Sequence, residues 1–129
     1  MAHYEHLPLY NKAFSILREF HIRVPKFAKQ YKYSLGGRLL DLSTKIIELI
    51  IRANGERENE QRAEMIERLC LHIEILIIQL RIANELKQLG GQRPYLYLSE
   101  LVIDLSKQAE GWRKYTPQNA KAESLGSEG

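Results

Sequence analysis

The sequence has one cysteine, no long apolar run and no targeting segment, and each of these absences excludes a class of protein. A single cysteine, Cys70, among 129 residues excludes an internal disulfide framework and fits a reducing compartment. No segment approaches the roughly 18 unbroken apolar residues that indicate a membrane span. The N-terminal residues lack a basic stretch followed by an apolar one, so we expect no secretory signal peptide. Together these features predict a soluble cytoplasmic protein that does not contact a membrane.

Runs that alternate β-branched and polar residues are nearly absent, which argues against a β-sheet. Apolar residues instead recur every three or four positions, the spacing of an amphipathic helix. We expect four such helices, at about residues 8–24, 34–54, 60–89 and 94–112. Four amphipathic helices with short connections predict an all-α fold, an antiparallel up-down four-helix bundle over residues 1–115. The small polar residues 116–129 predict a disordered tail.

Turn-forming residues separate the predicted helices. Pro25 cannot continue the first helix, and residues 26–32 are expected to form a short extra turn or two. Ser34 is predicted to cap the second helix through its hydroxyl group. Asn54-Gly55 predicts a left-handed residue at the end of that helix, and Gly90-Gly91 is expected to stop the third helix.

The third predicted helix is apolar on almost every side between Leu69 and Ala83. A helix of this kind is either central in a large fold or buried against another subunit. A bundle of 129 residues has little room for the first arrangement, so we expect homo-oligomerisation. The predicted subunit interface is the apolar face outside the core stripe: Leu71, Ile75, Ile78 and Ile82.

Positive charge is concentrated in the first half of the chain. The formal net charge is +3, yet residues 10–52 hold nine basic and three acidic side chains, a surplus of six. Such an asymmetry concerns the binding partners of a protein, and this one indicates a polyanion. The predicted nucleic-acid-binding residues are the cations around the first turn: Arg18, Arg23, Lys26, Lys29, Lys32 and Arg38. The neighbouring rings of Phe27, Tyr31 and Tyr33 are expected to pack against the end of the bundle.

No arrangement of residues indicates catalysis, a metal or a cofactor. A carboxylate-bridged dimetal site in a four-helix bundle needs Glu-x-x-His pairs, and the residue three before His72 is Leu69. Gly36-Gly37 lacks the spacing of a phosphate-binding loop and predicts instead the close approach of a neighbouring helix or subunit. Cys70 is expected to behave as a small apolar residue with a raised pKa. We therefore expect that the protein is not an enzyme.

Residues 20–54 resemble a known family. Two stretches of the sequence carry this resemblance: Phe20-His-Ile-Arg-Val-Pro-Lys-Phe-Ala-Lys-Gln-Tyr-Lys-Tyr-Ser-Leu-Gly-Gly-Arg-Leu39 and Ile46-Ile-Glu-Leu-Ile-Ile-Arg-Ala-Asn54. Both are similar to the accessory variability determinant proteins of diversity-generating retroelements. These proteins belong to a wider four-helix-bundle group that includes the proteins of ribosomal-RNA intervening sequences. Arg93-Pro-Tyr-Leu-Tyr-Leu-Ser-Glu-Leu101 and Gly111-Trp112 resemble the same group, so the resemblance spans roughly residues 7–112.

The resemblance implies a homopentameric barrel of bundles that binds a reverse transcriptase and nucleic acid, and that supports mutagenic copying of template RNA into cDNA. It implies that the six cations around the first turn contact the nucleic acid. Two functions remain open at this point. The first is this non-enzymatic accessory role, and the second is an oligomeric protein-interaction module that binds no nucleic acid.

Overall fold

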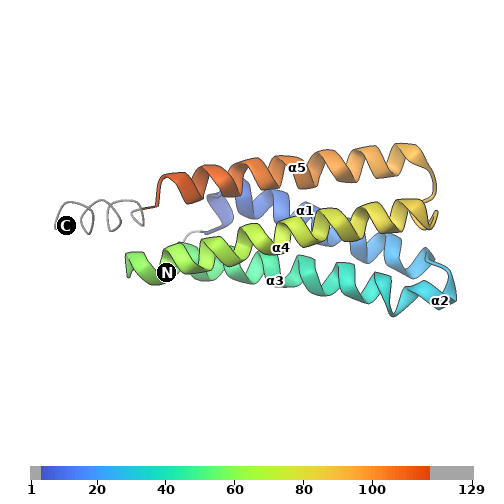
Figure 1. Ribbon diagram of the computed structural model, residues 1–129, viewed down its shortest axis with the longest axis horizontal. Coiled ribbons are helices and arrows are strands. Elements are labelled where there is room, and N and C mark those ends of the chain that lie inside the picture. Colours follow the sequence, from blue (N-terminus) through green and yellow to red (C-terminus); the bar gives the residue numbers. More distant parts are fainter. Residues whose placement is uncertain (1–3, 117–129) are drawn as a thin grey trace, which may run out of the picture.

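The computed structural model describes residues 4–116, and over this range it contains helices and no strand. The helices are η1 (Tyr4–His6), α1 (Pro8–Arg23), η2 (Val24–Lys26), α2 (Lys29–Lys32), α3 (Leu35–Gly55), α4 (Asn59–Glu85) and α5 (Gln92–Lys114). Figure 1 shows the long helices α1, α3, α4 and α5 lying side by side along one axis. The all-α helical bundle predicted from the apolar spacing is therefore confirmed. Most of the predicted tail, residues 117–129, lies outside the described residues.

Each long helix packs against two neighbours: α1 against α3 and α5, and α4 against α3 and α5. Antiparallel helices connected in this order bury one apolar stripe from each helix in a shared core. The side chains that are almost completely removed from solvent come from all four helices and include Ile16, Phe20, Leu39, Ile46, Ile50, Ile66, Leu69, Ile73, Leu76, Leu98 and Leu105.

The two ends of the bundle differ in composition. At one end, η2 and α2 connect α1 to α3, and the turn between α4 and α5 lies at the same end (Figure 1). We call this end, made of residues 24–38 and 86–93, the α2 end. The backbone amide of Ala28 donates a hydrogen bond to Oε1 of Gln88 over 2.7 Å, so the two connections are joined directly. The opposite end carries Glu56 and Glu58 in the α3–α4 loop and Glu60 in the first turn of α4.

The close approach predicted for Gly36-Gly37 is confirmed at one of the two glycines. A β-carbon built on Gly36 would lie 2.6 Å from Cγ1 of Val24 and 3.5 Å from the Phe27 ring, whereas one built on Gly37 would meet nothing within 4 Å. Gly36 therefore lets η2 cross directly over the first turn of α3, and this crossing positions the cations that follow Val24.

Two predicted turn features are wrong. Ser34 occupies the N-cap position of α3, but its Oγ donates to the carbonyl of Gln30 over 3.3 Å and caps no amide of α3. Because α2 ends just before Ser34, its last carbonyls compete for the hydroxyl. The left-handed residue predicted at Asn54-Gly55 is not found. Gly55 is the last residue of α3 and does not have a positive φ, and the chain leaves the helix through Glu56 in an extended conformation.

The end of α4 also differs from the prediction. The helix stops at Glu85 rather than at Gly90, and Lys87 adopts the left-handed conformation with a φ of 59°. The amides of Lys87 and Gln88 donate to the carbonyls of Asn84 and Ala83, the pattern of a Schellman motif. This early turn brings Leu89 back into the core, where it is 3% exposed. Between residues 4 and 116, no helix combines the length and apolarity required to cross a membrane.

Candidate nucleic-acid interface

The six cations predicted to bind nucleic acid lie on four consecutive elements. Arg18 and Arg23 are on α1, Lys26 is in η2, Lys29 and Lys32 form the ends of α2, and Arg38 is in the first turns of α3. The four from Lys26 onward lie in the α2 end, Arg23 directly precedes it as the last residue of α1, and Arg18 lies farther along α1. Arg18, Lys26, Lys29 and Arg38 are exposed, while Arg23 and Lys32 are half-buried. The fold therefore brings most of the predicted set to one end of the bundle.

Most of these cations have no carboxylate partner. Within residues 4–116, no Asp or Glu oxygen lies within 4.0 Å of the charged nitrogens of Arg18, Lys26, Lys29, Lys32 or Arg38. Arg23 is the exception, because its Nη2 lies 3.4 Å from Oε1 of Glu19 one helical turn away. The guanidinium of Arg18 lies over the ring of Phe14, 6.0 Å from its centroid, at a distance typical of a cation–π contact.

The tertiary structure adds two cations that the sequence reasoning did not select. Lys87 belongs to the α4–α5 turn and Arg93 to the first turn of α5 that follows it, and the Ala28–Gln88 hydrogen bond joins the α4–α5 turn to the first turn. Neither residues 24–38 nor residues 86–93 contain an aspartate or a glutamate. This absence of acidic residues is visible in the sequence, but only the fold shows that the two segments share one surface. The α2 end is therefore a basic surface, because the two segments that form it contain no carboxylate to neutralise their cations.

The aromatic rings of the first turn divide between the core and the surface. Phe27 is buried at 4% exposure, and Tyr31 packs against the core, as the packing hypothesis predicted. Tyr33 does not pack there, since it is 84% exposed beside Lys32. One ring of the three is thus open to stack on a base or on a partner side chain.

A second group of cations lines a groove between α3 and α4. The groove has a volume of about 250 Å³ and is lined by Lys45, Glu48, Leu49, Arg52, Arg68 and His72. Lys45 pairs with Asp41 over 3.1 Å, and Nδ1 of His72 lies 2.8 Å from the carbonyl oxygen of Arg68. Sequence reasoning missed this groove because its residues come from two helices whose facing sides cannot be assigned before the packing is known.

The residues predicted to form a subunit interface lie on the outer face of α4. Leu71 and Ile78 are each 56% exposed, Ile82 is 37% exposed, and Ile75 is half-buried. Leu86 continues the same stripe with 38% exposure. Packing within one chain therefore leaves the outer face of α4 as a continuous apolar stripe, which we call the α4 stripe: Leu71, Ile75, Ile78, Ile82 and Leu86.

The remaining reactive group is the thiol of Cys70. Burial raises its pKa to about 12, and the neighbouring carboxylate of Glu110 adds to this shift. The thiol consequently stays protonated near neutral pH, as predicted. Elsewhere in residues 4–116, no three histidine, cysteine, aspartate or glutamate side chains are grouped closely enough to hold a metal ion.

Comparisons of the chain with protein-family models, with curated proteins and with solved structures find no match, so the assignment of function starts from the α2 end itself.

Proposed function

We propose that this chain is a non-enzymatic accessory protein of a diversity-generating retroelement, which binds nucleic acid through the α2 end and presents it to a reverse transcriptase. The observation that supports this proposal is the gathering of exposed cations from two connections that contain no carboxylate. Unpaired lysine and arginine side chains on one surface attract the phosphate backbone, and each phosphate contact releases condensed counterions.

The form of the α2 end favours contact with the phosphate backbone over reading of base edges. Four of its six cations are lysines with flexible side chains, and three of these lysines lie in the short helices η2 and α2. Contacts of this kind position a nucleic acid without specifying its sequence. Such binding suits an accessory role in the copying of different templates of RNA into cDNA.

The reverse transcriptase and the retroelement enter the proposal through the resemblance of residues 20–54 to accessory variability determinant proteins. The same residues include η2, α2 and the Gly36 crossing, which together shape the α2 end. The single thiol of Cys70 fits a reducing cytoplasm, where we expect the protein to act.

Assembly into a homopentameric barrel is part of the proposal. The α4 stripe leaves apolar side chains of one helix exposed to solvent, and burial against another copy of the chain would remove them from water. A pentameric ring needs a head-to-tail contact, in which the α4 stripe of one copy packs against a different surface of the next copy. The α4 stripe also supports the second candidate, an oligomeric interaction module without nucleic-acid binding.

Titration of labelled RNA and DNA at two salt concentrations, about 50 mM and about 200 mM, tests the leading proposal. We expect binding at the lower concentration that weakens by at least tenfold at the higher one, because several phosphate contacts release counterions together. Light scattering on the same samples measures the subunit number. An absence of binding at low salt, with an oligomeric mass, would support the interaction module instead.

A further inference from the structure

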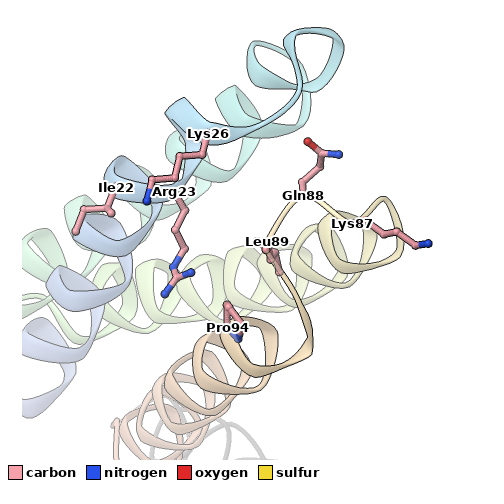
Figure 2. Close-up of a pocket in the computed structure, with 8 residues that line it drawn as sticks. Ile22, Arg23, Lys26, Lys87, Gln88, Leu89 and Pro94 are labelled. Carbon is pink, nitrogen blue, oxygen red and sulfur yellow. The ribbon is translucent and has the colours of Figure 1, made fainter.

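A cavity of about 400 Å³ opens within the α2 end, between the last turn of α1 and the α4–α5 turn. Its lining consists of Ile22, Arg23, Lys26, Lys87, Gln88, Leu89, Gly90 and Pro94. Figure 2 shows that Arg23 points from α1 toward Leu89 and Pro94, whereas Lys87 points away from it on the outer side of the turn. The side of the cavity formed by α1 and η2 therefore carries two cations and Ile22, and the opposite side carries Leu89, Gly90 and Pro94.

The charge of this cavity is positive and only partly neutralised. No carboxylate is among its lining residues, and within residues 4–116 the only acidic oxygen near its cations is Oε1 of Glu19, 3.4 Å from Nη2 of Arg23. Nε of Arg23 is buried and has no hydrogen-bond partner among the described residues. Because this nitrogen is removed from solvent, a ligand in the cavity would meet the rest of the Arg23 side chain, which is 24% accessible. A guanidinium forms charge-assisted hydrogen bonds with phosphate as well as with carboxylate.

The α4–α5 turn and the apolar side chains around the cavity limit the size of the ligand that it can hold. The α4–α5 turn passes through Gly90, with a φ of 85°, and Gly91, with a φ of 133°, so it adds no side chain there. Gln88 is held away from the cavity's ligand space by its bonds to Ala28 and to the carbonyl of Leu86. Ile22, Leu89 and Pro94 supply apolar surface beside the cations. The volume of the cavity is within the range of about 300–1,000 Å³ that sites for small organic ligands span.

We propose that this cavity binds a phosphate monoester, either the terminal phosphate of a nucleic-acid strand or the phosphate of a free nucleoside phosphate. A monoester carries up to two negative charges at neutral pH and three free oxygens, which suits a cavity lined by both Arg23 and Lys26. An internal phosphodiester continues on both sides and would follow the open surface of Lys29, Lys32 and Arg38. The apolar wall is placed to contact the sugar or base that follows the phosphate. This inference deepens the proposed function and rests on it.

The test compares oligonucleotides of one sequence with a phosphate at the 5′ end, with a phosphate at the 3′ end, or with hydroxyl groups at both ends. We expect one phosphorylated form to bind about tenfold more tightly than the hydroxyl form, the effect of one or two added charge-assisted hydrogen bonds. A nucleoside monophosphate should compete with the terminal phosphate for the cavity, so in its presence the phosphorylated and hydroxyl oligonucleotides should bind with similar affinity. Lys26→Gln should abolish the preference, Lys26→Arg should retain it, and the remote control Lys107→Gln should leave it unchanged.

The outcomes separate this inference from the proposed function. Equal affinity for all three oligonucleotides would overturn the cavity's role while the salt-dependent binding at the α2 end remains. Binding of the nucleoside monophosphate alone, lost in Lys26→Gln, would support the cavity with a free nucleotide as its ligand and contradict strand binding. A terminal-phosphate preference that persists in Lys26→Gln would also overturn the inference.

Discussion

A β-carbon added to Gly36 would lie 2.6 Å from Cγ1 of Val24, closer than side chains pack in proteins. Val24 is buried at 4% exposure directly after α1, and Gly36 lies in the first turn of α3. The contact therefore sets how α1 and α3 are joined, and with it the position of the α2 end.

Gly36→Ala tests this contact. We expect the substitution to lower the free energy of unfolding by about 1–3 kcal/mol, the usual cost of overpacking a tight contact. Gly37→Ala is a matched control in the same helix, because its β-carbon would meet nothing within 4 Å. It should raise the free energy of unfolding by about 0.5–1 kcal/mol through helix propensity. Urea denaturation measures both, and equal effects would contradict the packing argument.

Lys87→Gly should stabilise the protein, because Lys87 occupies the left-handed position of the Schellman motif with a φ of 59°. A glycine there avoids the steric penalty of a β-carbon, which predicts a gain of about 1 kcal/mol. Lys107→Gly, within the exposed face of α5, should instead cost about 1 kcal/mol, because the residue is in ordinary helical conformation. Thermal or urea unfolding that gives both substitutions the same sign would refute this explanation.

Lys29→Gln should weaken nucleic-acid binding about equally for all sequences and should reduce the slope of log K against log salt by about 1. Lys29 is exposed and has no carboxylate partner among the described residues, so the free energy of unfolding should change by no more than about 0.5 kcal/mol. Lys107→Gln, about four helical turns along α5 from the α2 end, is the control and should bind as the wild type does. Loss of binding in both variants would argue against a localised interface.

Cys70→Ala should change how stability depends on alkaline pH. The thiol pKa is raised from 9.0 to about 12 in the folded chain, so the folded state holds its proton after the unfolded state has lost it. The stability associated with the protonated thiol is fully present below pH 9 and is lost as the pH rises toward about 12. The difference in unfolding free energy between wild type and Cys70→Ala should therefore shrink over this pH window. A constant difference would show that the thiol pKa is not perturbed.

Ile78→Lys tests the α4 stripe as a subunit interface. Ile78 is 56% exposed within one chain, so a lysine there should leave the helical bundle intact by circular dichroism but lower the mass found by light scattering. Leu96→Lys is the control, because Leu96 is equally exposed, at 58%, on α5. If Ile78→Lys has the same mass as the wild type in light scattering, the subunit interface does not include the α4 stripe.

The helical bundle could be predicted from the sequence because the spacing of apolar residues within each helix depends only on neighbouring positions in the chain. The apolar residues that recur at spacings of three and four along residues 9–24 are buried at Leu9, Ala13, Ile16, Phe20 and Val24, and half-buried at Leu17. Pro25 ended α1 for an equally local reason, the restriction that its ring places on the residue before it.

The turn details were less predictable because tertiary contacts decided them. Gly90-Gly91 is the stronger local signal for a helix stop, yet α4 ends five residues before Gly90. Ending there buries Leu89 and lets Gln88 accept the hydrogen bond from Ala28, and these contacts outweigh the strain of a left-handed Lys87. Neither contact can be read from residues near Glu85.

The sequence by itself determined the four apolar stripes, the excess of positive charge in its first half and the surplus apolar face that became the α4 stripe. Only the tertiary structure decided that residues 24–38 and 86–93 form one basic end and enclose a cavity. The physical reason is that periodicity and charge are properties of neighbouring residues, whereas the α2 end depends on antiparallel packing that joins segments 60 residues apart.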